Sequence, residues 1–420
     1  MIRPAIYHEK LESGAQDKRV AAASLKTCEV SGAAASHPTT GKLRPHILYV
    51  IDQLCQLGGA ERALLQIVSR LCSERFQTSV VTFQTNQHIE TLLKLSGRLH
   101  VLPLRKTYNL NAAKMAFQFN RILRLDGTSI VHTFFETADL WAAPIAKLSG
   151  CPILISSRRD MGILRTRKHN LAYPFVNRLF DRVLAVSEEV RSYSIRQDRL
   201  SPQKVETLYN GVDIAELDRK AAEGNARQEL GLQTGVPVVS TLANIRSIKG
   251  IDVLVGAARR VCIEFPQTTF LVVGRVLEPE TMVALQAQVD SLRLTDNFRF
   301  TGEMANPFPV LRASNVFCLP SRNEGFSNAL IEAMGSGLPC IATRVGGNAE
   351  ALVEGENGYL VASEDANAMA DRILGLLRDR ELAKQIGSAA RVTVRERFSM
   401  EAMMNRLMGI YDELLAAKHV

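Results

Sequence analysis

Strand-like runs of β-branched and apolar residues alternate with helical segments along most of this chain, and this alternation constrains the fold more than any other feature. A first series of runs lies at 46–54, 78–83, 98–104, 129–135, 152–157 and 182–187. The pattern starts again at 236–244, 268–274, 298–302, 316–320 and 339–343. Such alternation is typical of a parallel sheet covered by helices. The sequence therefore predicts an α/β protein with two doubly wound, Rossmann-like domains that face each other across a cleft.

The length of 420 residues suits two domains of ordinary size. We expect an N-terminal domain at 44–208, a C-terminal domain at 209–398, and a final helix at 399–420 that packs back toward the N-terminal domain. Residues 1–43 are rich in Ala, Ser and Thr without periodicity, which predicts a disordered tail. Ligands of doubly wound folds bind at the carboxyl ends of the strands, so the cleft is the expected site.

The net charge of +8 is unevenly distributed. Residues 1–200 hold 28 of the 51 lysines and arginines but only 16 of the 43 acidic residues. A basic N-terminal half indicates an anionic partner. No helix-turn-helix, zinc-finger or aromatic RNA-binding pattern is present, so we expect no nucleic acid; an anionic membrane surface or a phosphorylated substrate fits better.

Several other classes are unlikely from composition and motifs. The seven cysteines form no CxxC pair and the eight histidines are dispersed, so neither a metal site nor a disulfide framework is expected. The first strand-to-helix turn reads QLGGAER and no GxGxxG occurs, which argues against a dinucleotide cofactor. No apolar run approaches a membrane span and no signal-peptide pattern occurs, so we expect a cytoplasmic protein.

Two glutamates, Glu324 and Glu332, have seven residues between them in SRNEGFSNALIEAMGSG, which follows the run at 316–320. We expect a loop at 322–325 and a helix that starts near Ser327, whose free N–H groups form an anion site. Glu332 then lies about 7.5 Å further along the helix axis, roughly the span from a diphosphate to a ribose. Glu324 lies on the other side of the anion site. The alternative for both carboxylates is a purely structural charge at a helix end.

The run S-x-x-E-G-F-S-x-A-x-I-E-A-M-x-x-G-x-P, followed by GG-x-x-E at 346–350, resembles the nucleotide-sugar site of the retaining family-4 glycosyltransferases of GT-B fold. The resemblance extends to GGAER at 58–62, YNGVD at 209–213 and R-x-x-KG at 246–250, and covers the chain from about residue 44 onward. It implies that a nucleoside-diphosphate sugar binds the C-terminal domain, along Gly325, Phe326, Ser327, Asn328 and Glu332, and that the N-terminal domain faces the acceptor.

The resemblance also assigns roles to other residues. Arg246 and Lys249 are implied to neutralise the departing diphosphate, a role that a metal fills in other transferases. The family more often has its arginine at the position of Asn244, so Lys249 is the stronger candidate of the pair. Gly58 and Gly59 resemble the glycine loop that approaches the donor from the N-terminal domain, although any tight strand-to-helix turn favours glycine.

Three further candidates lie in the N-terminal domain. His132 resembles a family histidine that contacts the donor sugar, but the second histidine of the usual H-x-H pair is Phe134 here, and a buried structural histidine is an equal alternative. Arg158 and Arg159 follow the next strand and are expected on the acceptor side. We therefore list Glu324, His132, Arg246 and Lys249 as candidate catalytic residues.

The resemblance thus implies a retaining glycosyltransferase, with no cofactor, that moves a sugar from a nucleoside-diphosphate donor to an acceptor hydroxyl, for which we expect a lipid-linked or polysaccharide acceptor. The basic amphipathic segments 112–125 and 165–180 predict peripheral contact with the inner face of a membrane. Two alternatives remain open: a nucleotide-sugar 2-epimerase, for which no acid/base set is assignable, and a non-catalytic subunit that binds sugar nucleotides or polysaccharide.

Overall fold

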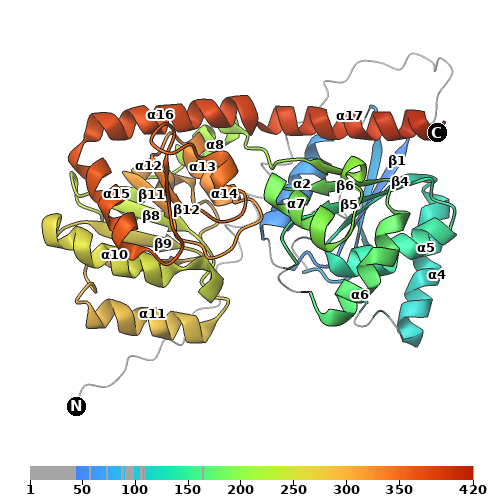
Figure 1. Cartoon of the computed structure of the whole chain (residues 1–420), viewed down its shortest axis with the longest axis horizontal. Helices are drawn as coiled ribbons and strands as arrows, with labels where there is room; N and C mark the ends of the chain where they lie inside the picture. The colour runs from blue at the N-terminus through green and yellow to red at the C-terminus, as the bar shows by residue number, and fades with distance from the viewer. Residues whose placement is uncertain are drawn as a thin grey trace.

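The computed structural model describes residues 44–55, 58–71, 74–86, 89, 99–104, 107, 109–162 and 165–419. Two parallel sheets, each flanked by helices, lie side by side and confirm the predicted fold class (Figure 1). The tail predicted for residues 1–43 lies outside the described residues. In the described part of the chain, no helix combines the length and the apolar composition needed to cross a membrane.

The N-terminal sheet has seven parallel strands in the order β3-β2-β1-β4-β5-β6-β7. Their bounds are β1 (His46–Ile51), β2 (Gln77–Thr82), β3 (Leu99–Val101), β4 (Thr128–Phe134), β5 (Ile153–Arg158), β6 (Arg182–Ala185) and β7 (Val205–Thr207). The four strands β1, β2, β4 and β5 carry long runs of buried residues because helices cover both faces of the sheet.

Alternate residues of β1 mark the two faces of this sheet. Ile47, Tyr49 and Ile51 belong to one apolar cluster with α2 (Gly59–Arg70), whereas Leu48 and Val50 belong to another with α4 (Leu110–Leu125). The other described helices of this domain are η1 (Ala138–Ala142), α5 (Ala143–Leu148), α6 (Arg167–Val176), η2 (Asn177–Leu179), α7 (Glu188–Gln197) and η3 (Pro202–Lys204).

The C-terminal sheet has six parallel strands in the order β10-β9-β8-β11-β12-β13. They are β8 (Val238–Leu242), β9 (Thr269–Val273), β10 (Phe298–Gly302), β11 (Val316–Leu319), β12 (Cys340–Thr343) and β13 (Tyr359–Val361). The helices around it are α8 (Ile214–Ala221), α9 (Ala226–Glu229), η4 (Ser247–Lys249), α10 (Ile251–Glu264), α11 (Pro279–Ser291), α12 (Phe308–Ala313), α13 (Asn328–Gly335), α14 (Asn348–Ala351), α15 (Ala366–Arg378) and α16 (Arg380–Arg397).

The last helix, α17 (Met400–Lys418), crosses from the C-terminal domain to the N-terminal one, as Figure 1 shows along the top of the molecule. It packs with α2 on the face of the N-terminal sheet that carries Ile47, Tyr49 and Ile51. At the crossing, Val212 and Ser399 form a parallel bridge, since the N–H of Val212 donates to the oxygen of Phe398 and that of Met400 to the oxygen of Val212. The two chain segments that join the domains therefore run side by side.

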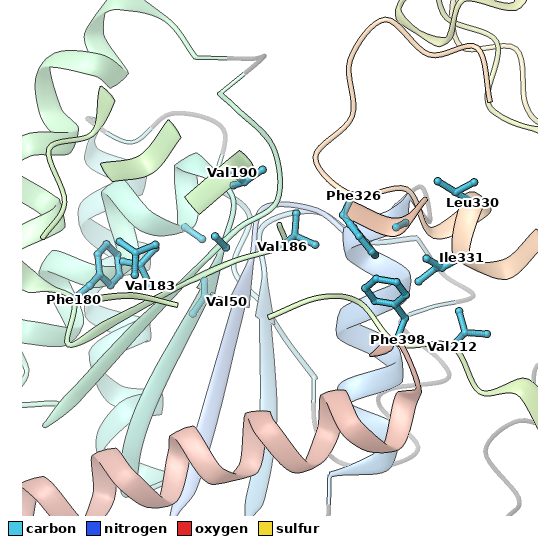
Figure 2. Packing of buried hydrophobic residues seen from close by; sticks show 14 of the residues in the cluster. Val50, Phe180, Val183, Val186, Val190, Val212, Phe326, Leu330, Ile331 and Phe398 are labelled. Carbon is cyan, nitrogen blue, oxygen red and sulfur yellow. The ribbon is translucent and has the colours of Figure 1, made fainter. Parts of the chain in front are cut away.

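An apolar cluster continues across the junction of the domains. It includes Val186 and Val190 from the N-terminal domain and Phe326, Ile331 and Phe398 from the C-terminal part, which Figure 2 shows close together. The ring of Tyr209 lies 5.1 Å from that of Phe326 and 5.3 Å from that of Phe398, centroid to centroid. This packing holds the two domains in contact.

Candidate functional site

The segment between β11 and α13 forms the centre of the candidate site. The hydroxyl of Ser327 caps α13 by accepting the N–H of Leu330, which leaves earlier N–H groups of the first turn without intrahelical partners. The loop before the cap is held by close backbone approaches. A Cβ on Gly346, which has φ +50°, would lie 1.7 Å from the backbone oxygen of Glu324, so no other residue fits there.

Glu324 and Lys249 lie in direct contact. The Lys249 ammonium donates to Glu324 Oε1 at 2.6 Å, and the hydroxyl of Ser321 donates to the same oxygen at 2.7 Å. The Glu324 side chain is largely buried, whereas that of Lys249 is about a quarter exposed. An incoming diphosphate would therefore meet a lysine whose charge is neutralised by Glu324 and would compete with that carboxylate.

Glu332 lies in the second turn of α13 and differs from Glu324 in having no partner. Among the described residues its carboxyl group accepts no hydrogen bond and forms no ion pair. Burial raises the pKa of Glu332 to about 7, against the opposing influence of Arg62 and Lys220. A half-buried carboxylate without a partner is costly in a folded protein, and such groups are candidates for ligand contacts.

The N-terminal domain approaches the start of α13 through the Gly58–Gly59 turn. The side-chain amide of Asn328 donates to the backbone oxygen of Gly59 at 3.2 Å. The side-chain oxygen of Asn328 accepts from the side-chain amide of Asn210. A Cβ on Gly325 would lie 2.1 Å from the oxygen of Arg159. These contacts bring together segments that are far apart in the sequence, at the place where the two domains meet: residues 58–59, 159, 210, 325 and 328.

Arg246 and Lys249 contact different carboxylates. Its guanidinium donates to Glu278 Oε1 at 3.3 Å, and it remains substantially exposed. The other Glu278 oxygen accepts the N–H of Ser247 at 2.7 Å. The side-chain oxygen of Asn244, where the family more often has arginine, accepts the N–H of Arg275. To meet a diphosphate, Arg246 would have to leave Glu278, which keeps Lys249 the stronger candidate.

His132 occupies the interior of the N-terminal domain. Its Nδ1 lies 2.8 Å from the hydroxyl of Tyr411 and its Nε2 lies 2.9 Å from that of Ser157, so both ring nitrogens are engaged. Burial lowers the pKa of His132 to about 3, which keeps the ring neutral. In this structure His132 has no nitrogen free for a donor sugar, and the buried structural histidine that the sequence left open describes it better.

The two neighbouring arginines have different environments. Arg158 is 3% exposed, contacts Asp139 Oδ2 at 2.7 Å and Asn177 Oδ1 at 2.7 Å, and is closed off from any acceptor. Arg159 donates to Asn210 Oδ1, beside Gly325 and Asn328. Arg158 is thus already engaged by Asp139 and Asn177, whereas Arg159 lies where the two domains meet. The acceptor-side role expected for both arginines remains a proposal, and the position of Arg159 suits it better.

Two carboxylates at the domain junction received no role from the sequence. Glu350 of the GG-x-x-E motif accepts the N–H groups of Glu188 and Glu189, at 2.8 and 2.9 Å, and the hydroxyl of Tyr209 at 2.9 Å. Glu61 of the GGAER motif is 5% exposed, and burial raises its pKa above the ordinary value. Both lie in motifs that the sequence marks. The contacts of Glu350 are with distant segments, whereas Glu61 lies against the backbone of Gly58 in its own turn. Across the described residues, no group of three or more His, Cys, Asp or Glu is arranged to hold a metal ion.

Two family models match the chain, one to each half. Residues 57–216 match "Glycosyltransferase Family 4" and residues 223–393 match "Glycosyl transferases group 1". Solved structures share the fold. A glycosyltransferase from Rickettsia africae superposes with a TM-score of 0.79 at 21% identity over 89% of this chain and 99% of its own. HepE of Anabaena, solved with UDP-glucose, gives 0.76 at 22% identity over 87% and 99%.

Curated relatives give the same class. The lipopolysaccharide core mannosyltransferase LpcC of Rhizobium leguminosarum is 31% identical over 59% of this chain and 69% of its own length. N-acetyl-alpha-D-glucosaminyl L-malate synthase of Bacillus anthracis is 32% identical over 56% of this chain, and the match spans 60% of that enzyme. UDP-Gal:alpha-D-GlcNAc-diphosphoundecaprenol alpha-1,3-galactosyltransferase of Escherichia coli is 23% identical over 86% and 95%.

Two facing Rossmann-like domains of parallel sheets are the GT-B fold. The family models and the curated relatives give the class of enzyme, a glycosyltransferase. The chain belongs to glycosyltransferase family 4, the enzymes also described as glycosyl transferases group 1.

Proposed function

We propose that this enzyme transfers a sugar from a nucleoside-diphosphate sugar to an acceptor hydroxyl with retention of the anomeric configuration. The observation that carries the proposal is the half-buried, unpartnered Glu332, one turn inside the helix whose N-terminus faces the Gly58–Gly59 turn of the other domain. The ribose hydroxyls would donate to Glu332, and the diphosphate would lie at the start of α13.

The charge that develops on the leaving diphosphate would be met by two elements. The first is the N-terminus of α13, where backbone N–H groups and the helix dipole favour an anion. The second is Lys249, released from Glu324 as the phosphate arrives. Glu324 would then be free to hold the transferred sugar while the acceptor oxygen attacks from the face that the diphosphate leaves. Arg159 and the Gly58–Gly59 turn would line the opposite wall.

We further propose that the acceptor is a lipid-linked or polysaccharide glycan and that the enzyme works in the cytoplasm, at the inner face of a membrane. Two observations support this. By their names, LpcC acts in lipopolysaccharide core biosynthesis and the Escherichia coli galactosyltransferase acts on a sugar linked to diphosphoundecaprenol. The N-terminal half of this chain also carries the excess of positive charge expected beside anionic lipid.

The test is release of nucleoside diphosphate from a panel of UDP-, GDP- and ADP-sugars by the purified protein, with and without EDTA. We expect slow hydrolysis of one donor, unaffected by EDTA, with the anomeric configuration retained in the product. Lys249→Ala should abolish it, whereas Lys384→Ala, an exposed lysine of α16 that pairs with Glu381, should not. A donor that binds and stays intact would instead identify a non-catalytic binding subunit, and epimerised sugar would identify an epimerase.

A further inference from the structure

The outer side of three helices of the N-terminal domain carries an unusual concentration of exposed apolar side chains. Eleven large apolar residues among those described are exposed, and six of them lie in α4, α5 and α6: Leu110, Phe117, Leu125, Leu148, Leu171 and Phe175. The three helices cover the face of the sheet opposite α17 and lie together in Figure 1. We call their solvent side the apolar-basic face.

In α4, apolar and basic side chains share the solvent side. Leu110, Lys114, Phe117 and Arg121 follow one another at intervals of three and four residues, and Phe117 is 75% exposed. At 100° per residue these positions, with Arg124 and Leu125, fall within about 100° of arc. The opposite side packs in the core through Ala112, Met115, Phe119 and Leu123. Core packing therefore explains the inner side of α4 and leaves the outer apolar residues unexplained.

The neighbouring helices repeat the pattern. Lys147 and Leu148 end α5, with Leu148 89% exposed, and α6 and η2 expose Leu171 and Phe175 with Arg167, Lys168 and Arg178. The sequence of α4, α5, α6 and η2 contains no Asp or Glu. A solvated surface normally mixes both signs of charge, so a face with only cations among exposed Leu and Phe side chains needs another explanation.

The α6 part of this face is rigidly attached to the sheet. Its inward residue, Tyr173, lies between two guanidinium groups, with Arg158 at 4.3 Å and Arg165 at 4.1 Å from the ring centroid. The hydroxyl of Tyr173 donates to Asp139, which also pairs with Arg158. Because Arg158 ends β5 and is followed by Arg159 at the cleft, this anchor connects the exposed face to the candidate site.

We propose that the apolar-basic face docks on a bilayer that contains anionic lipid. Phe and Leu side chains enter the boundary between headgroups and acyl chains, while Lys and Arg meet the lipid phosphates. This composition fits a lipid surface better than a folded protein partner, which would supply carboxylates at fixed positions. The proposed use, to hold the cleft beside a lipid-linked acceptor, rests on the proposed function; the docking itself is argued from exposure and charge alone.

The test is co-sedimentation of the full chain with vesicles of phosphatidylcholine, alone or mixed with phosphatidylglycerol, without donor or acceptor. We expect binding to the mixed vesicles that falls as salt rises. Lys114→Gln with Arg121→Gln should weaken binding about fivefold per cation removed. Phe117→Ser with Phe175→Ser should weaken it at least tenfold. Ile263→Ser with Val283→Ser, a matched pair exposed on the C-terminal domain, should leave it unchanged.

Three outcomes would overturn the proposal: no binding to either vesicle, equal binding to both, or equal losses in the matched pairs of variants. The first would leave an acidic protein partner as the better explanation of the face. Since all the substituted side chains are exposed, unchanged unfolding midpoints should accompany each loss. The result does not depend on catalysis. A transferase that uses a soluble acceptor would not sediment with the vesicles but would still release nucleoside diphosphate. A non-catalytic subunit would sediment with the vesicles and release none.

Discussion

At the scale of single residues, the two glutamates of the β11–α13 segment have opposite environments. Glu324 is held by Lys249 and Ser321, so its charge is balanced before any ligand arrives. Among the residues that the structure describes, Glu332 has no such partner, and burial raises its pKa to about 7. A carboxyl group in this state gains most from a ligand that donates hydrogen bonds, whereas one already paired gains least. The two substitutions to glutamine should therefore differ in kind.

We expect Glu332→Gln to weaken the free nucleoside diphosphate of the correct donor by about ten- to a hundredfold, since hydrogen bonds to a charged group are lost. Glu324→Gln should leave that affinity equal or higher, because Lys249 is released, and should reduce turnover instead. Calorimetry with the free diphosphate and steady-state kinetics measure the two effects. Equal losses of diphosphate affinity would show that the pair only braces the loop and helix.

The raised pKa adds a signature for Glu332. Because ribose hydroxyls donate to the ionised carboxylate, diphosphate affinity in the native enzyme should increase between about pH 6 and about pH 8, as Glu332 loses its proton. The ligand's own phosphate titrates in this range, so Glu332→Gln serves as the control. The difference between the two pH profiles isolates Glu332, and parallel profiles would contradict its contact with the ligand.

At the scale of elements, Glu350 connects the C-terminal domain to the start of α7. Its two oxygens accept the first N–H groups of that helix, in addition to the Ser187 cap that accepts from Val190. A carboxylate at a helix N-terminus also interacts favourably with the helix dipole. Glu350 thereby takes the place of water at the N-terminus of α7, although it lies about 160 positions later in the chain.

Glu350→Ala should lower the free energy of unfolding by about 1–2 kcal/mol, the usual effect of losing a helix cap, and should speed amide exchange at Glu188 and Glu189. Chemical denaturation and hydrogen exchange resolved by mass spectrometry measure both. Glu356→Ala, at an exposed position nearby, is the control and should change neither quantity. Unchanged exchange at the start of α7 would show that this contact does not hold the domains together.

At the scale of the whole molecule, α17 completes the N-terminal core. Eight of its residues are buried, and they belong to the cluster that contains Ile47, Tyr49 and Ile51. The hydroxyl oxygen of Tyr411 also lies 2.9 Å from that of Tyr49 and 2.8 Å from Nδ1 of His132, within hydrogen-bond distance of both. Since each large apolar side chain contributes about 1.5–3 kcal/mol when buried, their sum is as large as the usual net stability of a domain.

A chain ended after Ser399 should therefore fail to fold its N-terminal domain. A chain ended after Leu415, which removes only exposed residues among those described, should fold as the full protein does. Near-ultraviolet circular dichroism and hydrogen exchange of β1 and β4 distinguish the two truncations. A cooperative unfolding transition of unchanged midpoint in the shorter chain would mean that the N-terminal core is complete without α17.

The sequence by itself determined the α/β class, the parallel sheets and the family, because hydrophobic periodicity and the spacing of Glu324 and Glu332 are local properties of the chain. Only the tertiary structure distinguished Arg158 from Arg159, adjacent residues of one type, because Asp139 and Asn177 enclose the first. It likewise placed His132 against Tyr411, 279 positions away, and Glu350 against α7. Burial and hydrogen-bond partners depend on which distant segments meet, and no local pattern contains that information.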